Sequence, residues 1–264
     1  MNKLQSKFHY VMNWLVSLFS KEKIRSVYKR SEIAPCRICM RDVDFHQSLT
    51  EYLFGKDIIC HDCCSHFVLL DRIVLYQGMR LWMLYEYQDA LENLIYQYKE
   101  QRDIALAEVF LYRFAHKINR RYVGYSLVFM PSSLQKIQER GFSHLKEMTK
   151  MLTLPYYDGV KKTSTQKQSL QNKKGRKTIG KYLELDDAIP IPDTPLLLFD
   201  DVCTSGATLS AVKTLFASHP HPVDACVLSV HPLFVEYCDE NSLSESEGCF
   251  ILKKQKEVGK CKKL

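Results

Sequence analysis

The stretch LLLFDDVCTSGATLS, residues 196–210, joins a short apolar run to two adjacent carboxylates and a loop of small hydroxylated residues. The apolar run has the length of a buried β-strand, and Asp200 and Asp201 follow at its carboxyl end. Two neighbouring carboxylates are unfavourable there unless a cation or hydroxyl groups lie beside them. The vicinal hydroxyls of a ribose, with or without Mg²⁺, would satisfy both.

The loop that follows the two acids has the composition of an anion site. It comprises Thr204, Ser205, Gly206, Ala207 and Thr208, and it runs into a helix predicted over 207–218. Small residues let backbone N–H groups approach an anion, and a helix N-terminus favours negative charge. The stretch therefore predicts a ribose 5-phosphate site, against the alternative of a strand–turn–helix with an incidental acidic pair.

The rest of the chain predicts an α/β fold. Apolar runs of strand length at 125–130, 195–199 and 223–230 alternate with helical patterns near 103–119, 139–152 and 207–218, and 71–103 is first strand-like and then helical. Such alternation is typical of a parallel sheet with flanking helices, which binds ligands at the carboxyl ends of its strands. We expect this domain to cover 71–235 and to be followed by a weakly ordered polar tail, 236–264.

Composition limits the class of protein. With 264 residues, 46% of them hydrophobic, the chain can form one good-sized domain and a small module, which excludes disorder throughout. No run reaches the roughly 18 apolar residues of a membrane span. Residues 1–30 contain an amphipathic helical pattern without a signal-peptide cleavage site. We expect this extension to pack on the protein, on a partner or on a membrane surface, and the protein to be cytoplasmic, in solution or at the inner face of the membrane.

Two CxxC pairs predict a metal module over 31–70. They contribute Cys36, Cys39, Cys60 and Cys63. Two such knuckles provide the four sulfurs of a structural, tetrahedral Zn²⁺ site. The alternatives are redox pairs or an iron–sulfur centre, but redox CxxC motifs usually stand alone and ferredoxin spacing differs. Cys64 is expected to be a bystander.

A basic segment lies within the predicted α/β domain, at 160–183. It has no acidic residue and eight basic ones: Lys161, Lys162, Lys167, Lys173, Lys174, Arg176, Lys177 and Lys181. The net charge of the whole chain is +7. A run of this kind suits a polyanion such as nucleic acid, or it forms a solvated loop.

These motifs resemble two known families. Residues 196–208 resemble the phosphoribosyl-pyrophosphate (PRPP) motif of type I phosphoribosyltransferases. With the four-cysteine module, VFMPSSLQKIQERGFSHLKEM (128–148) and QSLQNKKGR (168–176), the chain over about 33–231 resembles the ComF family of competence proteins. The family's RGFNQ is RGFSH here, with Ser143 and His144, and Ile179 stands where the family has an Asn after the basic hood.

The resemblance implies a fold and two alternative functions. The fold would be a type I phosphoribosyltransferase-like domain behind a zinc-ribbon-like module. The first function is an accessory role in natural transformation, in which the chain handles incoming single-stranded DNA beside a DNA-translocating ATPase and a recombination mediator. The basic residues from Lys161 to Lys177 would then contact the DNA backbone. The second function is phosphoribosyl transfer from PRPP with Mg²⁺ to an unknown nucleobase-like acceptor.

The resemblance also implies roles for individual residues. Asp200 and Asp201 would bind the ribose hydroxyls and be the catalytic residues, with Asp201 the better candidate for stabilising charge that develops on the ribose. Thr204, Ser205, Gly206, Ala207 and Thr208 would hold the 5-phosphate. Ser132, Ser133, Lys136 and Arg140 would lie on the pyrophosphate side. The alternative for Arg140 is a structural ion pair with Glu139 or Glu147.

Overall fold

The computed structural model describes residues 35–41, 58–162 and 183–242. The chain divides between Ser65 and His66 into two compact units, five residues before the boundary expected from the sequence. The predicted N-terminal amphipathic helix, most of the basic segment and the last part of the polar tail lie outside the described residues.

The first unit contains the two cysteine knuckles. After Cys36 the chain turns back, with the Met40 N–H donating to the Cys36 carbonyl at 2.9 Å. The second knuckle runs into the short helix α4 (His61–Ser65). The Arg37 N–H donates to the Ile58 carbonyl at 2.8 Å and so ties the two knuckles together.

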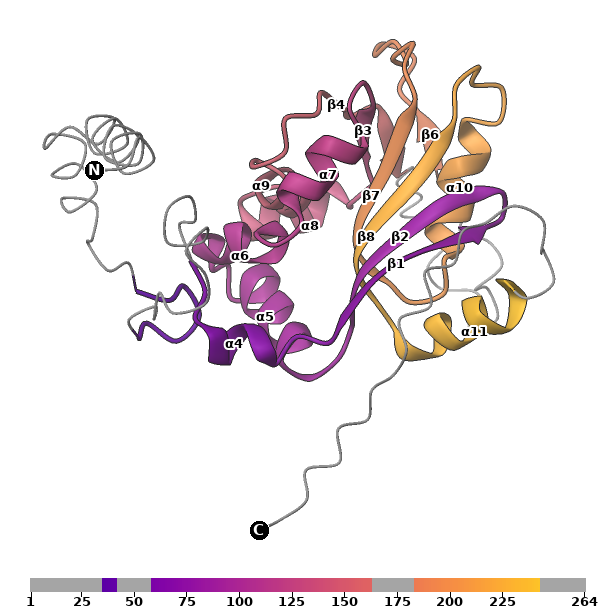
Figure 1. Cartoon of the computed structure of the whole chain (residues 1–264). Coiled ribbons are helices and arrows are strands. Elements are labelled where there is room, and N and C mark those ends of the chain that lie inside the picture. The colour runs from indigo at the N-terminus through magenta and orange to yellow at the C-terminus, as the bar shows by residue number, and fades with distance from the viewer. Residues whose placement is uncertain (1–34, 42–57, 163–182, 243–264) are drawn as a thin grey trace, which may run out of the picture. The chain divides into compact units, whose positions relative to one another are not determined.

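The second unit is built on a six-stranded sheet in the order β1-β2-β8-β7-β3-β4 (Figure 1). The strands are β1 (Leu69–Tyr76), β2 (Met79–Glu86), β3 (Ser126–Phe129), β4 (Tyr156–Tyr157), β7 (Leu196–Cys203) and β8 (Val223–Val230). Only β1 and β2 pair antiparallel, and the other neighbours are parallel. The predicted α/β class with a mostly parallel sheet is therefore confirmed.

Helices flank this sheet on its two sides. Figure 1 shows α5 to α9 on one side and α10 and α11 on the other. Their bounds are α5 (Asp89–Glu100), α6 (Ala107–Leu111), α7 (Ala115–Arg121), α8 (Leu134–Arg140), α9 (His144–Met148), α10 (Ala207–Leu215) and α11 (Pro232–Ser242). A separate two-stranded ribbon pairs β5 (Val160–Lys162) with β6 (Leu183–Leu185). Within the described ranges, no helix combines the length and hydropathy that a bilayer span requires.

The central strands bury the apolar runs seen in the sequence. Leu196 to Phe199 on β7 have no exposed surface, because β3 and β8 pair on either side and helices cover the sheet. β7 continues to Cys203, past the predicted end at 199, so the acidic pair belongs to the strand itself. Because Asp200 and Asp201 lie within β7, the strand backbone holds both residues in place relative to the sheet.

Several predicted elements are interrupted by local backbone chemistry. The helix expected at 103–119 is a 3₁₀ turn (Ile104–Leu106) followed by α6 and α7. In place of one helix at 139–152, α8 starts earlier and ends at Arg140, and α9 covers only His144–Met148, because Gly141 ends α8 in the left-handed region with φ 85°. The strand-like pattern after residue 71 is a hairpin, in which Gln77 and Gly78 both have positive φ.

The C-terminal prediction was also partly wrong. Residues 232–242 form α11, although the tail was expected to lose regular structure from 236. Phe234 and Cys238, one helical turn apart, are both buried. These two side chains dock the helix, whereas Leu233 and Tyr237 on the same helix are exposed.

Candidate functional site

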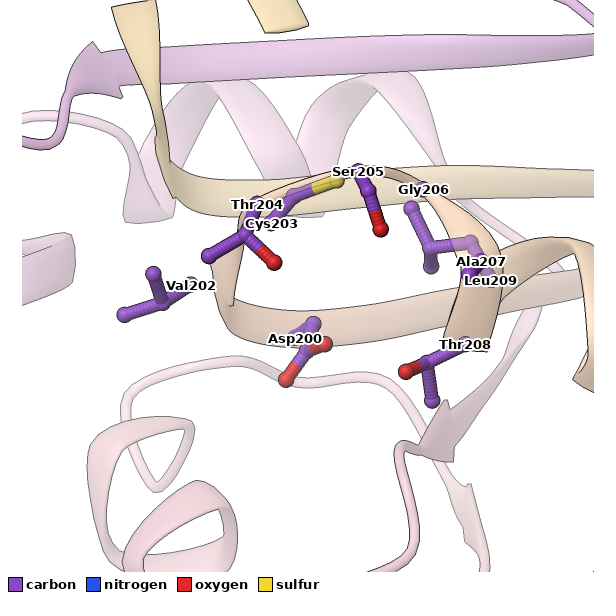
Figure 2. Close-up of a pocket in the computed structure, with 9 residues that line it drawn as sticks. All are labelled: Asp200, Val202, Cys203, Thr204, Ser205, Gly206, Ala207, Thr208 and Leu209. Carbon is purple, nitrogen blue, oxygen red and sulfur yellow. The ribbon is translucent and has the colours of Figure 1, made fainter. Parts of the chain in front are cut away.

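A small hollow lies where β7 ends and α10 begins. It contains about 220 Å³ of open space and is lined by Asp200, Val202, Cys203, Thr204, Ser205, Gly206, Ala207, Thr208 and Leu209. Figure 2 shows the Asp200 carboxylate and the hydroxyls of Thr204, Ser205 and Thr208 around the same hollow. Six of the seven predicted ribose 5-phosphate residues therefore line one pocket. Asp201 is the exception.

The loop backbone is held tightly against β1 and α11. Gly206 has φ 68°, and a Cβ atom built there would lie 2.4 Å from the Tyr76 hydroxyl. The Tyr76 ring packs edge-on against Phe234 with centroids 5.1 Å apart, and its hydroxyl is 3.2 Å from the Ser210 Oγ. Glycine is required here by both backbone conformation and space. The tight turn leads directly into α10, whose first residues line the hollow.

Asp200 is the acid that faces the hollow. It is partly exposed, and its Oδ1 accepts a hydrogen bond from the Asp201 N–H at 3.0 Å. Burial, followed by the neighbouring Asp201 charge, raises the pKa of Asp200 well above its ordinary value. A carboxyl in this state is well suited to a sugar hydroxyl or a cation, either of which would relieve the unfavourable charge.

Asp201 lies behind the pocket in a buried ionic cluster. Its side chain is 5% exposed, forms an ion pair with Lys99, and has its Oδ2 3.2 Å from the His144 Nε2. Burial acts to raise the pKa of Asp201, but the Lys99 ammonium and then His144 outweigh it and hold the pKa well below its ordinary value. Asp201 is thus an ionised carboxylate whose charge is already balanced by the protein.

Lys99 and His144 were not identified as site residues from the sequence. Lys99 is in the last turn of α5, and His144 is the first residue of α9. The sequence around His144 has no ligand spacing, which is typical of a structural histidine. The available signal was its place in the RGFSH segment beside Arg140.

Arg140 is enclosed within the protein. Its side chain is 7% exposed, its Nε donates to the Lys99 carbonyl at 3.0 Å, and one guanidinium nitrogen is 2.9 Å from the His144 Nδ1. Its acidic partner is Glu100, at 3.6 Å, and neither Glu139 nor Glu147. Its hydrogen bonds are therefore directed at the protein, which differs from the pyrophosphate contact that the resemblance implied.

The other residues predicted on the pyrophosphate side lie on the segment after β3. Ser133 caps α8 by accepting from the Lys136 N–H at 3.3 Å. Ser132 is partly exposed and Lys136 is exposed. These residues are accessible at a strand's carboxyl end, but none of them lines the hollow that Asp200 faces.

The four predicted metal ligands come together in the first unit. The Sγ atoms of Cys36, Cys39, Cys60 and Cys63 all lie within 4.8 Å of one another. The Cys60 N–H donates to the Cys36 Sγ at 3.3 Å, and the Cys63 N–H donates to the Cys60 Sγ at 3.5 Å. N–H groups directed at sulfur stabilise thiolates, so this cluster could hold a metal ion.

The basic segment is described only at its start. Lys161 and Lys162 are exposed on β5, and Lys161 forms an ion pair with Asp186. The other basic residues predicted to contact DNA lie outside the described residues: Lys167, Lys173, Lys174, Arg176 and Lys177.

Comparison with known proteins gives relatives in two species. The chain is 24% identical over 204 residues to the competence protein ComFC of Streptococcus pneumoniae, covering 68% of this chain and 92% of the relative. It is 24% identical over 213 residues to the competence protein ComFC of Bacillus subtilis, covering 77% of this chain and 82% of the relative. No family model matches the chain.

Similar solved structures include two phosphoribosyltransferases. One is a hypoxanthine phosphoribosyltransferase from Staphylococcus aureus, with a TM-score of 0.34, 13% identity, and coverage of 48% of this chain and 64% of that chain. The other is an orotate phosphoribosyltransferase from Aeropyrum pernix, with a TM-score of 0.28, 17% identity, and coverage of 67% and 84%. The resemblance predicted from the sequence is confirmed by the relatives: the ComFC competence proteins of two species are homologues of this chain.

Proposed function

We propose that this chain is a competence-associated protein that binds PRPP through its ribose 5-phosphate moiety and handles incoming single-stranded DNA. The observation that carries the proposal is the hollow between β7 and α10, which places Asp200 opposite the hydroxyls of Thr204, Ser205 and Thr208. The competence role is supported by the two ComFC homologues.

The chemistry of the pocket suits a sugar phosphate. The backbone N–H groups and hydroxyls of the loop are donors, and the N-terminus of α10 adds a positive dipole end, which together favour a phosphate. Asp200 provides an acceptor on the opposite side for ribose hydroxyls. Mg²⁺, bound with the pyrophosphate of PRPP, would relieve the charge that burial makes unfavourable on Asp200.

Zn²⁺ is the metal that we assign to the four-cysteine cluster. A tetrahedral Zn²⁺ with bonds of about 2.3 Å requires sulfurs about 3.8 Å apart. The Cys39 and Cys60 Sγ atoms are 3.7 Å apart. Four thiolates leave no open position, so the ion would stabilise the fold of the first unit and take no part in chemistry.

Single-stranded DNA is the partner that suits the basic segment at 160–183. A phosphate backbone pairs with Lys and Arg side chains and releases counterions, so the affinity should fall steeply with salt. Replacing Lys173, Lys174, Arg176 and Lys177 with Gln should weaken binding and reduce the salt dependence. Binding that is unaffected by salt, or absent from the pure protein, would contradict this part. The DNA-translocating ATPase and the recombination mediator remain proposed partners.

The experiment that tests the function as a whole is transformation of the organism that encodes the chain. Asp200→Asn should lower transformation frequency by roughly tenfold or more, since a site built to hydrogen-bond its ligand discriminates strongly when that bond is lost. Asp193→Asn, at a carboxylate whose side chain is 91% exposed, is the matched control and should transform normally. Normal transformation by Asp200→Asn at normal protein abundance would contradict the proposal.

A further inference from the structure

We infer that Arg140 and His144 are positioning residues: they hold Asp201 in place, and Asp201 in turn orients Asp200 toward the sugar. This inference rests on the proposed sugar-phosphate ligand and concerns how the protein prepares its site. It starts from an unusual feature of the second unit, a row of buried polar side chains that crosses from α8 through α9 to β7. Among these side chains, Arg140, His144 and Asp201 are each less than a tenth exposed.

The first link determines which nitrogen of His144 carries the proton. The Arg140 guanidinium is 2.9 Å from the His144 Nδ1, and a guanidinium has donors only. Nδ1 must therefore accept, which places the ring proton on Nε2. The partner of Nε2 is the Asp201 Oδ2, 3.2 Å away. Arg140 thus selects the tautomer that has its proton on the nitrogen nearest the carboxylate.

The second link runs from Asp201 to the pocket. The Asp201 N–H donates to the Asp200 Oδ1 at 3.0 Å, so the Asp201 backbone sets the direction of the Asp200 carboxylate. The Asp201 carbonyl, which belongs to the next peptide group, accepts from the Ser229 Oγ at 2.6 Å and so holds the Asp201 backbone from the β8 side. A change in how the Asp201 side chain is held is therefore transmitted to Asp200 through one residue of backbone.

Independent contacts keep His144 and Arg140 in register. The Tyr98 hydroxyl donates to the His144 carbonyl at 2.7 Å, and the Tyr98 ring packs against Phe142 with centroids 5.3 Å apart. The Arg140 Nε donates to the Lys99 carbonyl at 3.0 Å. The same peptide segment of α5 therefore anchors Arg140 and carries the ammonium that pairs with Asp201.

Because these charged groups are buried, their pairing is expected to add little to the free energy of unfolding. Buried charges pay a desolvation penalty that their pairing often only offsets, and well-packed apolar residues are frequently as stable. What such a network does supply is a single defined geometry. Among the residues that the structure describes, that geometry ends on Asp200, the carboxylate that lines the pocket.

The test compares ligand affinities of variants at His144. Gln has an oxygen that can accept from Arg140 and an N–H₂ that can donate to Asp201, whereas Leu can do neither. His144→Leu should weaken ribose 5-phosphate binding roughly tenfold, the effect of losing a hydrogen bond to a charged group. His144→Gln should bind within about twofold of the unsubstituted protein. His116→Leu and His116→Gln, at an exposed histidine on α7, are the matched controls and should both bind normally.

A second ligand separates positioning from general damage. Inorganic phosphate would use the Thr204–Thr208 loop without Asp200, so its affinity should be unchanged in His144→Leu. Equal loss for inorganic phosphate and ribose 5-phosphate would overturn the inference in favour of a structural role. Equal ribose 5-phosphate affinity of His144→Leu and the unsubstituted protein would overturn it as well.

The tautomer can be measured without any ligand. Nitrogen-15 NMR of the His144 ring in the full chain should show a protonated Nε2 and an unprotonated Nδ1, and a proton on Nδ1 would overturn the inference. This measurement does not depend on whether His144→Leu folds. Failure of the unsubstituted protein to bind ribose 5-phosphate would instead overturn the proposed function, and the inference with it.

Discussion

Lys99 forms an ion pair with the buried Asp201, and this contact joins the last turn of α5 to the carboxyl end of β7. It gives the two adjacent acids different roles. The charge of Asp201 is balanced inside the protein, whereas Asp200 faces the hollow and has no cationic side chain among the residues that line it. Asp200 is therefore the acid whose charge no side chain lining the hollow balances, whereas Asp201 is paired within the protein.

Removing the Lys99 ammonium should destabilise the second unit. Lys99→Met keeps most of the side-chain volume but leaves a buried carboxylate without its cation, which lowers the free energy of unfolding by about 3 kcal/mol. Urea unfolding measures the change. Lys117→Met is the control, because the Lys117 side chain is 56% exposed in its ion pair with Asp71, which should contribute less than about 1 kcal/mol.

A double variant tests the cause of this loss. Asp201→Asn removes the charge that Lys99 balances, so adding it to Lys99→Met should recover part of the lost stability. If the losses of stability in the two single variants simply add in the double variant, with no recovery, the ion-pair explanation is contradicted.

The two acids should respond to pH in opposite directions. The folded-state pKa of Asp201 is lowered, so its contribution to stability is complete above the ordinary value of 3.8 and is lost as the pH falls below it. The folded-state pKa of Asp200 is raised, so its contribution is complete below 3.8 and is lost as the pH rises through the folded pKa. Urea unfolding at a series of pH values should show both effects.

Asparagine variants separate the two contributions. Asp201→Asn should flatten the loss of stability in acid. Asp200→Asn should become more stable relative to the unsubstituted protein as the pH rises, because its side chain keeps an acceptor oxygen but cannot ionise. Asp193→Asn, at an exposed carboxylate, should change neither profile. If the free energy of unfolding changes with pH in the same way in the Asp200 and Asp201 variants, the protein does not balance the charges of the two acids differently.

Gly206 should tolerate no side chain. Ala at this position would have both a positive φ and a Cβ 2.4 Å from the Tyr76 hydroxyl, so the free energy of unfolding should fall by about 3 kcal/mol. Gly124→Ala is a matched control, because Gly124 has φ 81° but no atom within 4 Å of the added Cβ. It should cost only the backbone strain, about 1 kcal/mol. Thermal unfolding that ranks the two variants equally would exclude the predicted clash.

The cysteine cluster should bind one Zn²⁺ per chain. Cys39→Ser removes one of four thiolates, so the purified variant should lose most of its zinc, as measured by elemental analysis, because Ser is a poor ligand for this ion. Cys64→Ser is the control and should retain a full equivalent, since Cys64 is outside the cluster of four sulfurs. Iron in place of zinc, or a full equivalent in Cys39→Ser, would contradict the assignment.

The sequence allowed the sheet class, the cysteine cluster and the grouping of residues 204–208 at one hollow to be predicted, because each depends on residues that are close along the chain. Leu196–Thr208 contains its own strand, acids and helix start. The cluster around Asp201 could not be predicted in this way. Lys99 and His144 come from separate helices, and only the packing of α5 and α9 against β7 brings them to the carboxylate.

The predicted helix boundaries differ from those of the structure for a related reason. The apolar spacing of 139–152 is continuous, but Gly141 ends α8 and restarts the chain in a new direction at His144. That interruption turns Arg140 and His144 toward each other. α11 was missed because its two buried anchors, Phe234 and Cys238, are too few to produce a strong periodic pattern.

The most direct measurement is a calorimetric titration of the full chain with PRPP in the presence of Mg²⁺, beside the same titration of Asp200→Asn. The account predicts saturable binding by the unsubstituted protein and an affinity at least roughly tenfold weaker in Asp200→Asn, the effect of losing a hydrogen bond to a charged group. Absence of binding, or equal affinity of the two proteins, would contradict it.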